Sequence, residues 1–225
     1  MSVDEIPELL DAQKNSNTIL QLNYKGLTEL PSCLLQCQDL RQLQRLYLKR
    51  NVIKKLPEDI GKLSSLIELY LHSNELNELP NGVGDLVSLQ SLNVSCNHLT
   101  SVPVSIGCLS QLTTLHLANN EISTLPKELF SLRHLSTLDV MSNRLQHLPE
   151  EIGQCQSLQM LMLDKNRLSY LPNEICHLHH LEELSASGNC LLCIPPGLGN
   201  TDSLKNVYFD NNPYLHCLPW NLINK

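Results

Sequence analysis

Apolar and polar positions alternate in one short segment that recurs along the whole chain. Residues 66–74 read LIELYLHSN, in which Leu66, Leu69 and Leu71 precede Asn74. This alternation predicts a strand with one buried face. The asparagine position returns every 23 residues, at Asn51, Asn74, Asn97, Asn120, Asn143, Asn166, Asn189 and Asn212. A fixed internal period of this length indicates a repeat architecture.

The rest of each repeat predicts a turn and a short helical return. Leu76, Leu79 and Pro80 follow the asparagine, and Val83 and Leu86 come next. Apolar residues spaced by three suit a helical turn, and proline is tolerated at the first helical position because its missing N–H has no partner there. One unit cannot bury its own leucines, but stacked units can. We therefore expect an α/β solenoid of about nine repeats, with a curved parallel sheet on the concave face and short helical or 3-10 segments on the convex face.

The eight asparagines lie where the chain leaves the strand and turns inward. A side-chain amide there can satisfy backbone groups that no regular ladder reaches. We therefore predict a buried, hydrogen-bonded asparagine ladder. Replacing one asparagine by leucine should cost roughly 1–3 kcal/mol, the penalty for orphaned backbone groups.

The pattern LxxLxLxxN-x-L-x-x-L-P-x-x-I-G-x-L resembles the leucine-rich repeat family. It is similar to the 23-residue intracellular class, which includes the Scribble and Erbin scaffolds and Ras-pathway scaffold proteins. The stretches LYLKRN, ELYLHSN and VYFDNNPYLHCLP are closer still to little-characterised animal leucine-rich repeat-containing proteins. The resemblance covers residues 17 to about 222 and implies a concave sheet used for protein binding. Because a fold alone does not establish function, the surface needs its own interpretation.

The repeats predict a single leucine-rich repeat domain over residues 17–225, preceded by an N-terminal capping helix over residues 1–16. Ser2 and Glu5 can form a capping box for that helix. One repeat is three residues longer than the others, and the extra residues near Asp39–Leu43 should lengthen one convex helix by a turn. No polar capping segment follows the last repeat, which predicts an uncapped or truncated end, as in a short isoform or a fragment.

Composition narrows the class of partner. The net charge is −7, which argues against nucleic acid as a bulk electrostatic partner. No apolar window is long enough to span a bilayer, and the N-terminus lacks the features of a secretory signal. The nine cysteines are odd in number and scattered, which favours reduced thiols and a cytoplasmic location. We expect a protein partner, no membrane insertion, no small-molecule substrate and no cofactor.

Side chains between the buried strand leucines should form rows on the concave face, because neighbouring strands lie about 4.8 Å apart. The rows are basic and aromatic at the N-terminal end, contain three of the four methionines in the middle, and are acidic at the C-terminal end. Tyrosine, methionine and arginine are enriched at protein interfaces. A solvated face of miscellaneous residues remains the alternative. The expected partner-binding residues are Arg45, Tyr47, Lys49, Arg50, Tyr70, His72, His116, Asp139, Met141, Met160, Met162, Asp164, Glu183, Tyr208 and Asp210.

Two groups of residues have the composition of a chemical site. His116 and Asp139, with Ser91 and Ser95 nearby, contain the residue types of a hydrolase triad. An open sheet, however, offers no nucleophile elbow, oxyanion hole or water-excluding pocket. We therefore predict no catalytic residues.

Cys190 and Cys193 form a CxxC pair, and residues 176–180 add a cysteine and three histidines. A structural zinc site usually takes two close pairs at regular spacing. Here the first pair falls in a turn and the second group in a convex segment. We interpret both as structural and predict no metal site, although metal binding by the pair stays open.

Together these features predict a non-enzymatic protein–protein interaction module or scaffold, with a role in intracellular signal transduction. One alternative is a substrate receptor of a ubiquitin ligase or a similar machine, and a further alternative is a hydrolase-like enzyme. The sequence leaves the partner, the pathway and the oligomeric state open.

Overall fold

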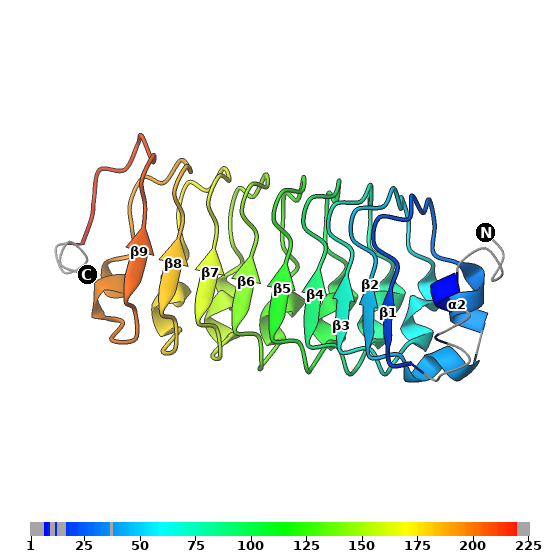
Figure 1. Cartoon of the computed structure of the whole chain (residues 1–225). Helices are drawn as coiled ribbons and strands as arrows, with labels where there is room; N and C mark the ends of the chain where they lie inside the picture. The colour runs from blue at the N-terminus through cyan, green and yellow to red at the C-terminus, as the bar shows by residue number, and fades with distance from the viewer. Residues whose placement is uncertain (1–6, 10–11, 13–16, 37, 220–225) are drawn as a thin grey trace.

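A computed structural model describes residues 7–9, 12, 17–36 and 38–219 of the 225-residue chain. Within these ranges, nine three-residue strands pair in parallel and in chain order to form one open sheet (Figure 1). The strands are β1 (Ile19–Gln21), β2 (Arg45–Tyr47), β3 (Glu68–Tyr70), β4 (Ser91–Asn93), β5 (Thr114–His116), β6 (Thr137–Asp139), β7 (Met160–Met162), β8 (Glu183–Ser185) and β9 (Asn206–Tyr208).

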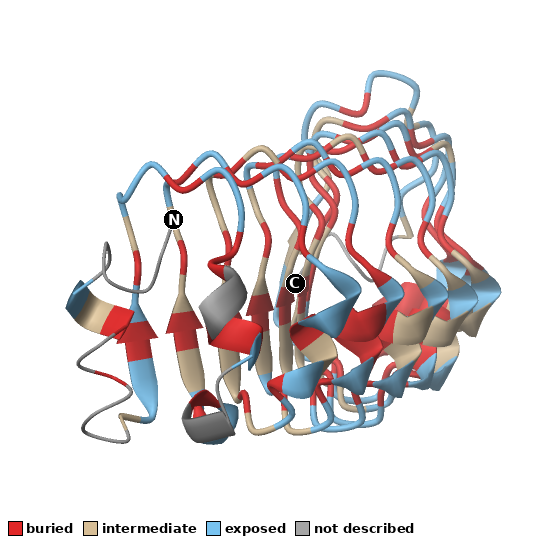
Figure 2. Cartoon of the chain, turned by 90° about the vertical axis from the view of Figure 1, so that its right-hand side faces the viewer, coloured by how far each residue is buried: buried red, intermediate tan, exposed pale blue. Residues whose placement is uncertain are grey.

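Short helices return the chain between strands and form the layer opposite the sheet (Figure 2). They are α2 (Ser32–Gln36), η2 (Gln38–Gln42), η3 (Glu58–Lys62), η4 (Asn81–Asp85), η5 (Val104–Cys108), η6 (Lys127–Ser131), η7 (Glu150–Gln154), η8 (Asn173–His177) and η9 (Pro196–Asn200), of which all but α2 are 3-10 helices. The predicted α/β repeat solenoid of about nine repeats is confirmed.

Proline sets the entry into the 3-10 helices, but one position earlier than predicted. Pro57 is the N-cap of η3, with φ −73° and ψ 152°, and not its first helical residue. Its carbonyl accepts a hydrogen bond from the Ile60 N–H at 3.0 Å. The fixed φ of proline suits this extended position, where its own N–H is not needed. Of the 3-10 helices named above, η9 alone begins with a proline, Pro196, which follows the N-cap Pro195.

The longer first connection differs from the prediction. The extra residues do not lengthen one convex helix. Instead, the connection between β1 and β2 holds two helical segments, α2 and η2, where the later connections hold one. The added residues are accommodated in the convex layer, because strand pairing between β1 and β2 keeps the register of the other pairs.

Strand and loop leucines fill the space between the two layers. Leu69, Leu71 and Leu76 are fully buried, as are their counterparts in the other central repeats. Parallel pairing continues beyond the three-residue strands, since the Leu71 N–H donates to the Asn93 carbonyl at 2.7 Å. The alternation of buried and outward side chains therefore continues for at least two residues after each strand.

From the second repeat on, one buried asparagine in each repeat links it to the repeat before it. The Asn97 side chain accepts a hydrogen bond from the Leu76 N–H at 2.9 Å. Its amide donates to the Leu71 carbonyl at 3.1 Å and to the Val94 carbonyl at 2.9 Å. The asparagines at this position, all buried, are Asn51, Asn74, Asn97, Asn120, Asn143, Asn166, Asn189 and Asn212. Each one thus satisfies backbone groups that the sheet leaves without partners.

The residue before each ladder asparagine adopts left-handed backbone geometry, which the sequence pattern did not reveal. Lys165 has φ 53° and Gly188 has φ 68°. This conformation costs roughly 1–2 kcal/mol for a residue with a side chain. The surrounding pairing holds it in place, for example through the Lys165 N–H, which donates to the Ser187 carbonyl at 2.7 Å.

Part of the predicted N-terminal cap is described. Residues 7–9 and 12 are helical, and Leu9 and Ala12 belong to the buried core. The predicted capping box of Ser2 and Glu5 lies outside the described residues. Throughout the described ranges, no helix has the length and apolar content needed to cross a membrane.

Candidate protein-binding face

The first and third side chains of each strand lie on the face of the sheet opposite the core, and only Ser185 of β8 is buried there among the nine strands. We use the term sheet face for three positions in each repeat: the first residue of the strand, the third residue of the strand, and the second residue after the strand ends. In β2 the central Leu46 is buried, while Arg45 and Tyr47 point outward. The register aligns Arg45 with Glu68 and Tyr47 with Tyr70, and the same alignment repeats along the sheet. All the predicted partner-binding residues except Arg50 lie in these rows.

The β2–β3 end of the sheet face is basic and aromatic, with its single carboxylate already paired. Arg45 Nε lies 3.1 Å from Glu68 Oε1, and the Tyr47 hydroxyl donates to Glu68 Oε2 at 2.6 Å. The rings of Tyr47 and Tyr70 are tilted, with centroids 5.2 Å apart. Burial, reinforced by the hydrogen bond and the charge of Glu68, raises the pKa of Tyr47 from 10.0 to about 12. Glu68 therefore links Arg45 to Tyr47, and the positive charge of Arg45 offsets its negative charge.

A shallow pocket of about 220 Å³ opens beside these tyrosines. It is lined by Gln21, Asn23, Tyr47, Lys49 and Tyr70. Asn23 Oδ1 accepts a hydrogen bond from the Lys49 N–H at 2.9 Å. This contact uses the acceptor of the Asn23 amide and leaves its two N–H donors for a ligand. Among the described residues, the Lys49 ammonium has no carboxylate within ion-pair distance. The pocket wall thus offers hydrogen-bond donors and a positive charge, and no acid.

His72 lies next to Lys49 in the row that follows the strands. Partial burial, with the positive charges of Lys49 and Arg50, lowers the pKa of His72 below its usual value of 6.5. Its Nδ1 is buried and has no hydrogen-bond partner in the described part of the chain. Arg50 lies outside the rows, in the turn after β2, where its guanidinium stacks 5.5 Å from the centroid of the Tyr24 ring. This end therefore holds more positive charge than it neutralises.

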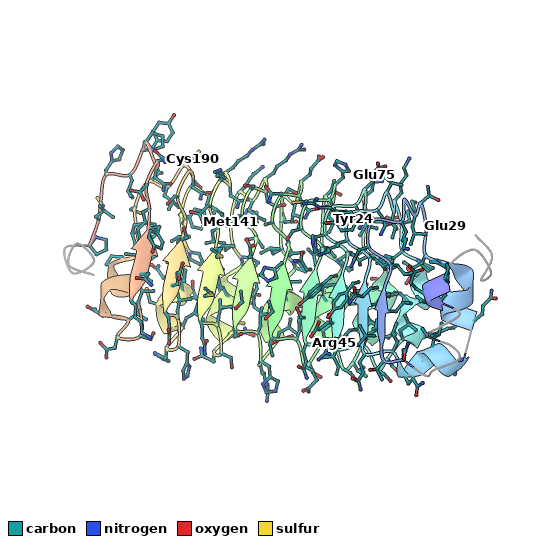
Figure 3. All side chains as sticks on the ribbon, viewed as in Figure 1. Tyr24, Glu29, Arg45, Glu75, Met141 and Cys190 are labelled. Carbon is teal, nitrogen blue, oxygen red and sulfur yellow. The ribbon has the colours of Figure 1, made fainter. Side chains whose placement is uncertain are left out.

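Methionines occupy the middle of the sheet face. Met160 is 36% exposed, and Met162 and Met141 are half-buried, while Leu161 between the first two is fully buried. Figure 3 shows Met141 beyond the ends of the strands and Arg45 near their beginnings. The three side chains place flexible apolar surface on β7 and just after the neighbouring strand β6.

His116 and Asp139 face each other across β5 and β6. His116 Nδ1 lies 3.5 Å from Asp139 Oδ2, and Asp139 Oδ1 accepts from the Met141 N–H at 3.1 Å. Ser91 is engaged elsewhere, since its hydroxyl donates to Tyr70 at 3.4 Å. In the described structure, neither Ser91 nor Ser95 hydrogen-bonds His116. The histidine–carboxylate pair predicted from the sequence is present, but it is not joined to a serine nucleophile.

The acidic end is weaker than the sequence suggests. Asp164 is only 8% exposed, and its Oδ1 accepts hydrogen bonds from the Ser185 hydroxyl and from the Ser187 N–H. Its carboxylate is thus committed to the protein itself. The accessible acidic groups in these rows are Glu183, which is half-buried, and Asp210, which is exposed.

The cysteines and histidines near the CxxC pair do not converge. Cys190 and Cys193 are exposed free thiols, and Cys176 is half-buried. Over the residues that the structure describes, no group of three or more His, Cys, Asp or Glu side chains could hold a metal ion. Cys155, in contrast, replaces a core leucine and is fully buried, and burial raises the pKa of its thiol to about 12. Such burial is typical of a cysteine that acts as a small apolar residue.

Sequence reasoning identified the tyrosines and Lys49 but missed the other wall of the pocket. Gln21 and Asn23 belong to the first repeat, where Lys25 replaces the ladder asparagine. Their row positions were visible from the 23-residue register. Their contribution to a pocket depends on the space that the tyrosine rings leave, which the register does not specify.

Comparison with known proteins supports the repeat assignment. A family model described as leucine rich repeat matches residues 41–99, 87–145 and 133–191, more than half of the chain. A leucine-rich repeat protein of Leptospira interrogans is 31% identical, with a TM-score of 0.82, over 97% of this chain and 61% of that one.

Two plant receptors are also similar. The peptide hormone receptor RGFR1, solved in complex with RGF2, is 33% identical with a TM-score of 0.71, over 77% of this chain and 29% of that one. The ectodomain of the receptor kinase GASSHO1/SCHENGEN3 from Arabidopsis thaliana, in complex with CASPARIAN STRIP INTEGRITY FACTOR 2, is 34% identical with a TM-score of 0.72, over 79% and 22%. The chain spans less than two thirds of the length of each of these three proteins. With its repeats matched by the family model, the chain belongs to the leucine-rich repeat family.

Proposed function

We propose that the chain is a non-enzymatic interaction module that binds a partner protein along the sheet face. The observation behind this proposal is the pairing of two unlike surfaces on one continuous sheet. A donor-lined pocket lies at β1–β3, and partly exposed methionines lie at β6–β7. The similar receptors RGFR1 and GASSHO1/SCHENGEN3 were each solved in a complex with a ligand, which supports a binding role for this fold.

The pocket suits an anionic group of the partner, such as a carboxylate or a phosphate. Lys49 supplies a positive charge, and Gln21, Asn23 and Tyr70 supply neutral donors. The nearby acid, Glu68, is paired with Arg45 and accepts a hydrogen bond from Tyr47. Charge-assisted hydrogen bonds to such a group are stronger than neutral ones, so this end would fix the orientation of the partner.

The methionines suit an apolar segment of the same partner. Methionine adapts its shape to irregular surfaces at low cost, and its burial removes apolar area from water. With a donor pocket at one end and Asp210 and Glu183 at the other, the sheet face favours a segment whose anionic group lies over β1–β3.

The cellular role belongs to the same proposal. We infer a cytoplasmic scaffold in signal transduction, similar to the 23-residue intracellular class that includes Scribble and Erbin. Proximity labelling in cells would test this role. Recovery of cell-cortex or Ras-pathway proteins would support it, and recovery of cullin adaptors would favour the ubiquitin-ligase receptor instead.

Affinity capture from cell extract tests the sheet face directly. The double variant Met160→Glu/Met162→Glu places two charges at the apolar centre, and it should reduce capture of the specific partners roughly tenfold or more. The matched control is Val87→Glu/Val104→Glu, which changes two exposed valines, 54% and 60% accessible, outside the sheet face. The control should capture the same partners as the wild type. Equal capture by the methionine variant would reject the site.

Inorganic phosphate is a simple probe of the pocket. An anion near Lys49 would screen the positive charges that depress the pKa of His72, so phosphate should raise the pKa of His72 measured by NMR. Lys49→Gln should abolish the phosphate effect and by itself raise the pKa of His72. If phosphate moves His72 equally in wild type and variant, the pocket does not bind anions through Lys49.

A further inference from the structure

Two exposed cysteines near the C-terminal end of the described chain face each other across consecutive repeats. Cys193 and Cys217 form an isolated parallel β-bridge. Hydrogen bonds flank the bridge on both sides. The Ile194 N–H donates to the Cys217 carbonyl at 3.3 Å, and the His216 N–H donates to the Leu192 carbonyl at 3.1 Å.

The repeat register accounts for this juxtaposition. Cys193 lies two residues before Pro195, and Cys217 lies two residues before Pro219. The two cysteines are 24 residues apart (217 − 193), one more than the 23-residue period, so the period alone does not align the two thiols. The extra residue lies in the loop between Asn212 and Cys217, and the backbone hydrogen bonds that follow this loop align Cys217 with Cys193.

Side chains at this row position do meet in an earlier pair of repeats. Lys55 and Glu78 also lie two residues before a proline, and their charged groups are 3.1 Å apart. Paired parallel backbones lie about 4.8 Å apart. A disulfide needs a Cα separation of about 4.4–6.8 Å. The bridge therefore holds the two cysteines within disulfide range, and both are exposed to a soluble oxidant.

We propose that Cys193 and Cys217 are a redox modification site. A small-molecule disulfide such as oxidised glutathione oxidises the two thiols, and an intramolecular disulfide forms between them. One thiolate attacks the oxidant, forms a mixed disulfide and releases one reduced glutathione. The second thiolate then displaces the other glutathione and closes the Cys193–Cys217 bond. Two thiols lose two protons and two electrons, and one glutathione disulfide becomes two thiols.

The bond would close a covalent loop around η9 and β9. β9 is the least buried strand, since Val207 is only half-buried where the other strands have a buried central leucine. Tyr208 and Asp210 of the sheet face lie within the loop. Oxidation would thus fasten the last described repeat to its neighbour and hold those two side chains in place.

Peptide mapping of the oxidised full chain tests the proposal. The reduced protein is incubated with oxidised glutathione, the remaining thiols are alkylated, and the digest is analysed by mass spectrometry without reduction. We expect a Cys193–Cys217 cross-link that disappears on reduction. A predominant link from Cys190 to either cysteine, or stable glutathione adducts on both cysteines without a cross-link, would overturn the assignment.

Serine variants provide matched controls at exposed positions. Cys190→Ser should retain the cross-link, because the Cys190 counterpart in the ninth repeat is Pro213 and no thiol faces it. Cys217→Ser should lose the cross-link and leave Cys193 as a glutathione adduct. A cross-link from Cys193 to another cysteine in Cys217→Ser, at wild-type yield, would show that the bridge geometry does not direct the reaction. Neither readout depends on partner binding, so it is separate from the tests of the sheet face.

Discussion

At the scale of single residues, the ladder asparagines hydrogen-bond buried backbone groups that regular secondary structure leaves unpaired in this fold. Asn120 accepts from the Leu99 N–H at 3.0 Å and donates to the Val94 and Leu117 carbonyls at 3.1 and 2.9 Å. Those groups belong to the turns of two repeats and are buried. Their satisfaction depends on one side chain, so its removal exposes more than one hydrogen-bonding defect.

Asn120→Leu should lower the free energy of unfolding by roughly 1–3 kcal/mol, because buried backbone groups lose their partners and leucine offers none. Urea denaturation would measure the change. The matched control is Asn77→Leu, at an exposed asparagine outside the ladder, which should stay within about 0.5 kcal/mol of wild type. Similar losses in both variants would contradict the special role of the ladder position.

Tyr47 predicts a specific dependence on alkaline pH. Burial and the contact with Glu68 raise its pKa from 10.0 to about 12, so the folded state holds the phenol proton longer than the unfolded state does. The stability that this group contributes is therefore complete below pH 10 and is lost as pH rises toward about 12. In a spectroscopic titration of the six tyrosines, the last ionisation step should disappear in Tyr47→Phe. It should persist in Tyr170→Phe, and its persistence in Tyr47→Phe would assign it to another residue.

At the scale of elements, the 3-10 helices pack closely enough that side-chain size decides their spacing. The Gly82 N–H at the start of η4 donates to Glu58 Oε2 of η3 at 2.7 Å. A Cβ atom on Gly82 would lie 1.9 Å from the Glu58 carbonyl oxygen. This contact involves backbone, which cannot move without shifting one helix against the other.

Gly82→Ala should therefore destabilise the protein by roughly 1–3 kcal/mol, the usual cost of overpacking. Gly197 occupies the equivalent position in η9, two residues after its N-cap proline. Its added Cβ would meet only the Cys176 side chain, at 3.1 Å from the sulfur. Gly197→Ala should thus cost much less in the same denaturation experiment. Equal costs would show that the layer can adjust its spacing at either position.

The elements also show what the sequence could predict. The repeated leucine pattern placed every strand and every outward-facing row, because strand alternation and stacking leave little freedom in an open sheet. Other features escaped it because they depend on local contacts. Asp164 is buried by Ser185, the extra residues of the first connection form a second helix, and the pocket depends on how the rings of Tyr47 and Tyr70 fill space.

At the scale of the whole molecule, each repeat is stabilised by its immediate neighbours. β5 pairs with β4 and β6, whereas β9 pairs with β8 alone among the described strands. The core residues follow the same trend. Leu115 and Leu117 around β5 are fully buried, but Val207 and Phe209 around β9 are only partly buried. In a solenoid, stability is close to a sum of repeat and interface terms, so the ends should open first.

Hydrogen exchange would test this gradient. Backbone amides in and just after β9, in the reduced protein, should exchange roughly tenfold faster or more than their counterparts at β5, because local opening there breaks one interface and exposes less apolar surface. The comparison pairs Asn206 of β9, whose N–H donates to the Glu182 carbonyl, with Thr114 of β5, whose N–H donates to the Gln90 carbonyl. Similar protection at both sites would mean that the nine strands open as one cooperative unit, and that β9 draws its stability from more than the contact with β8.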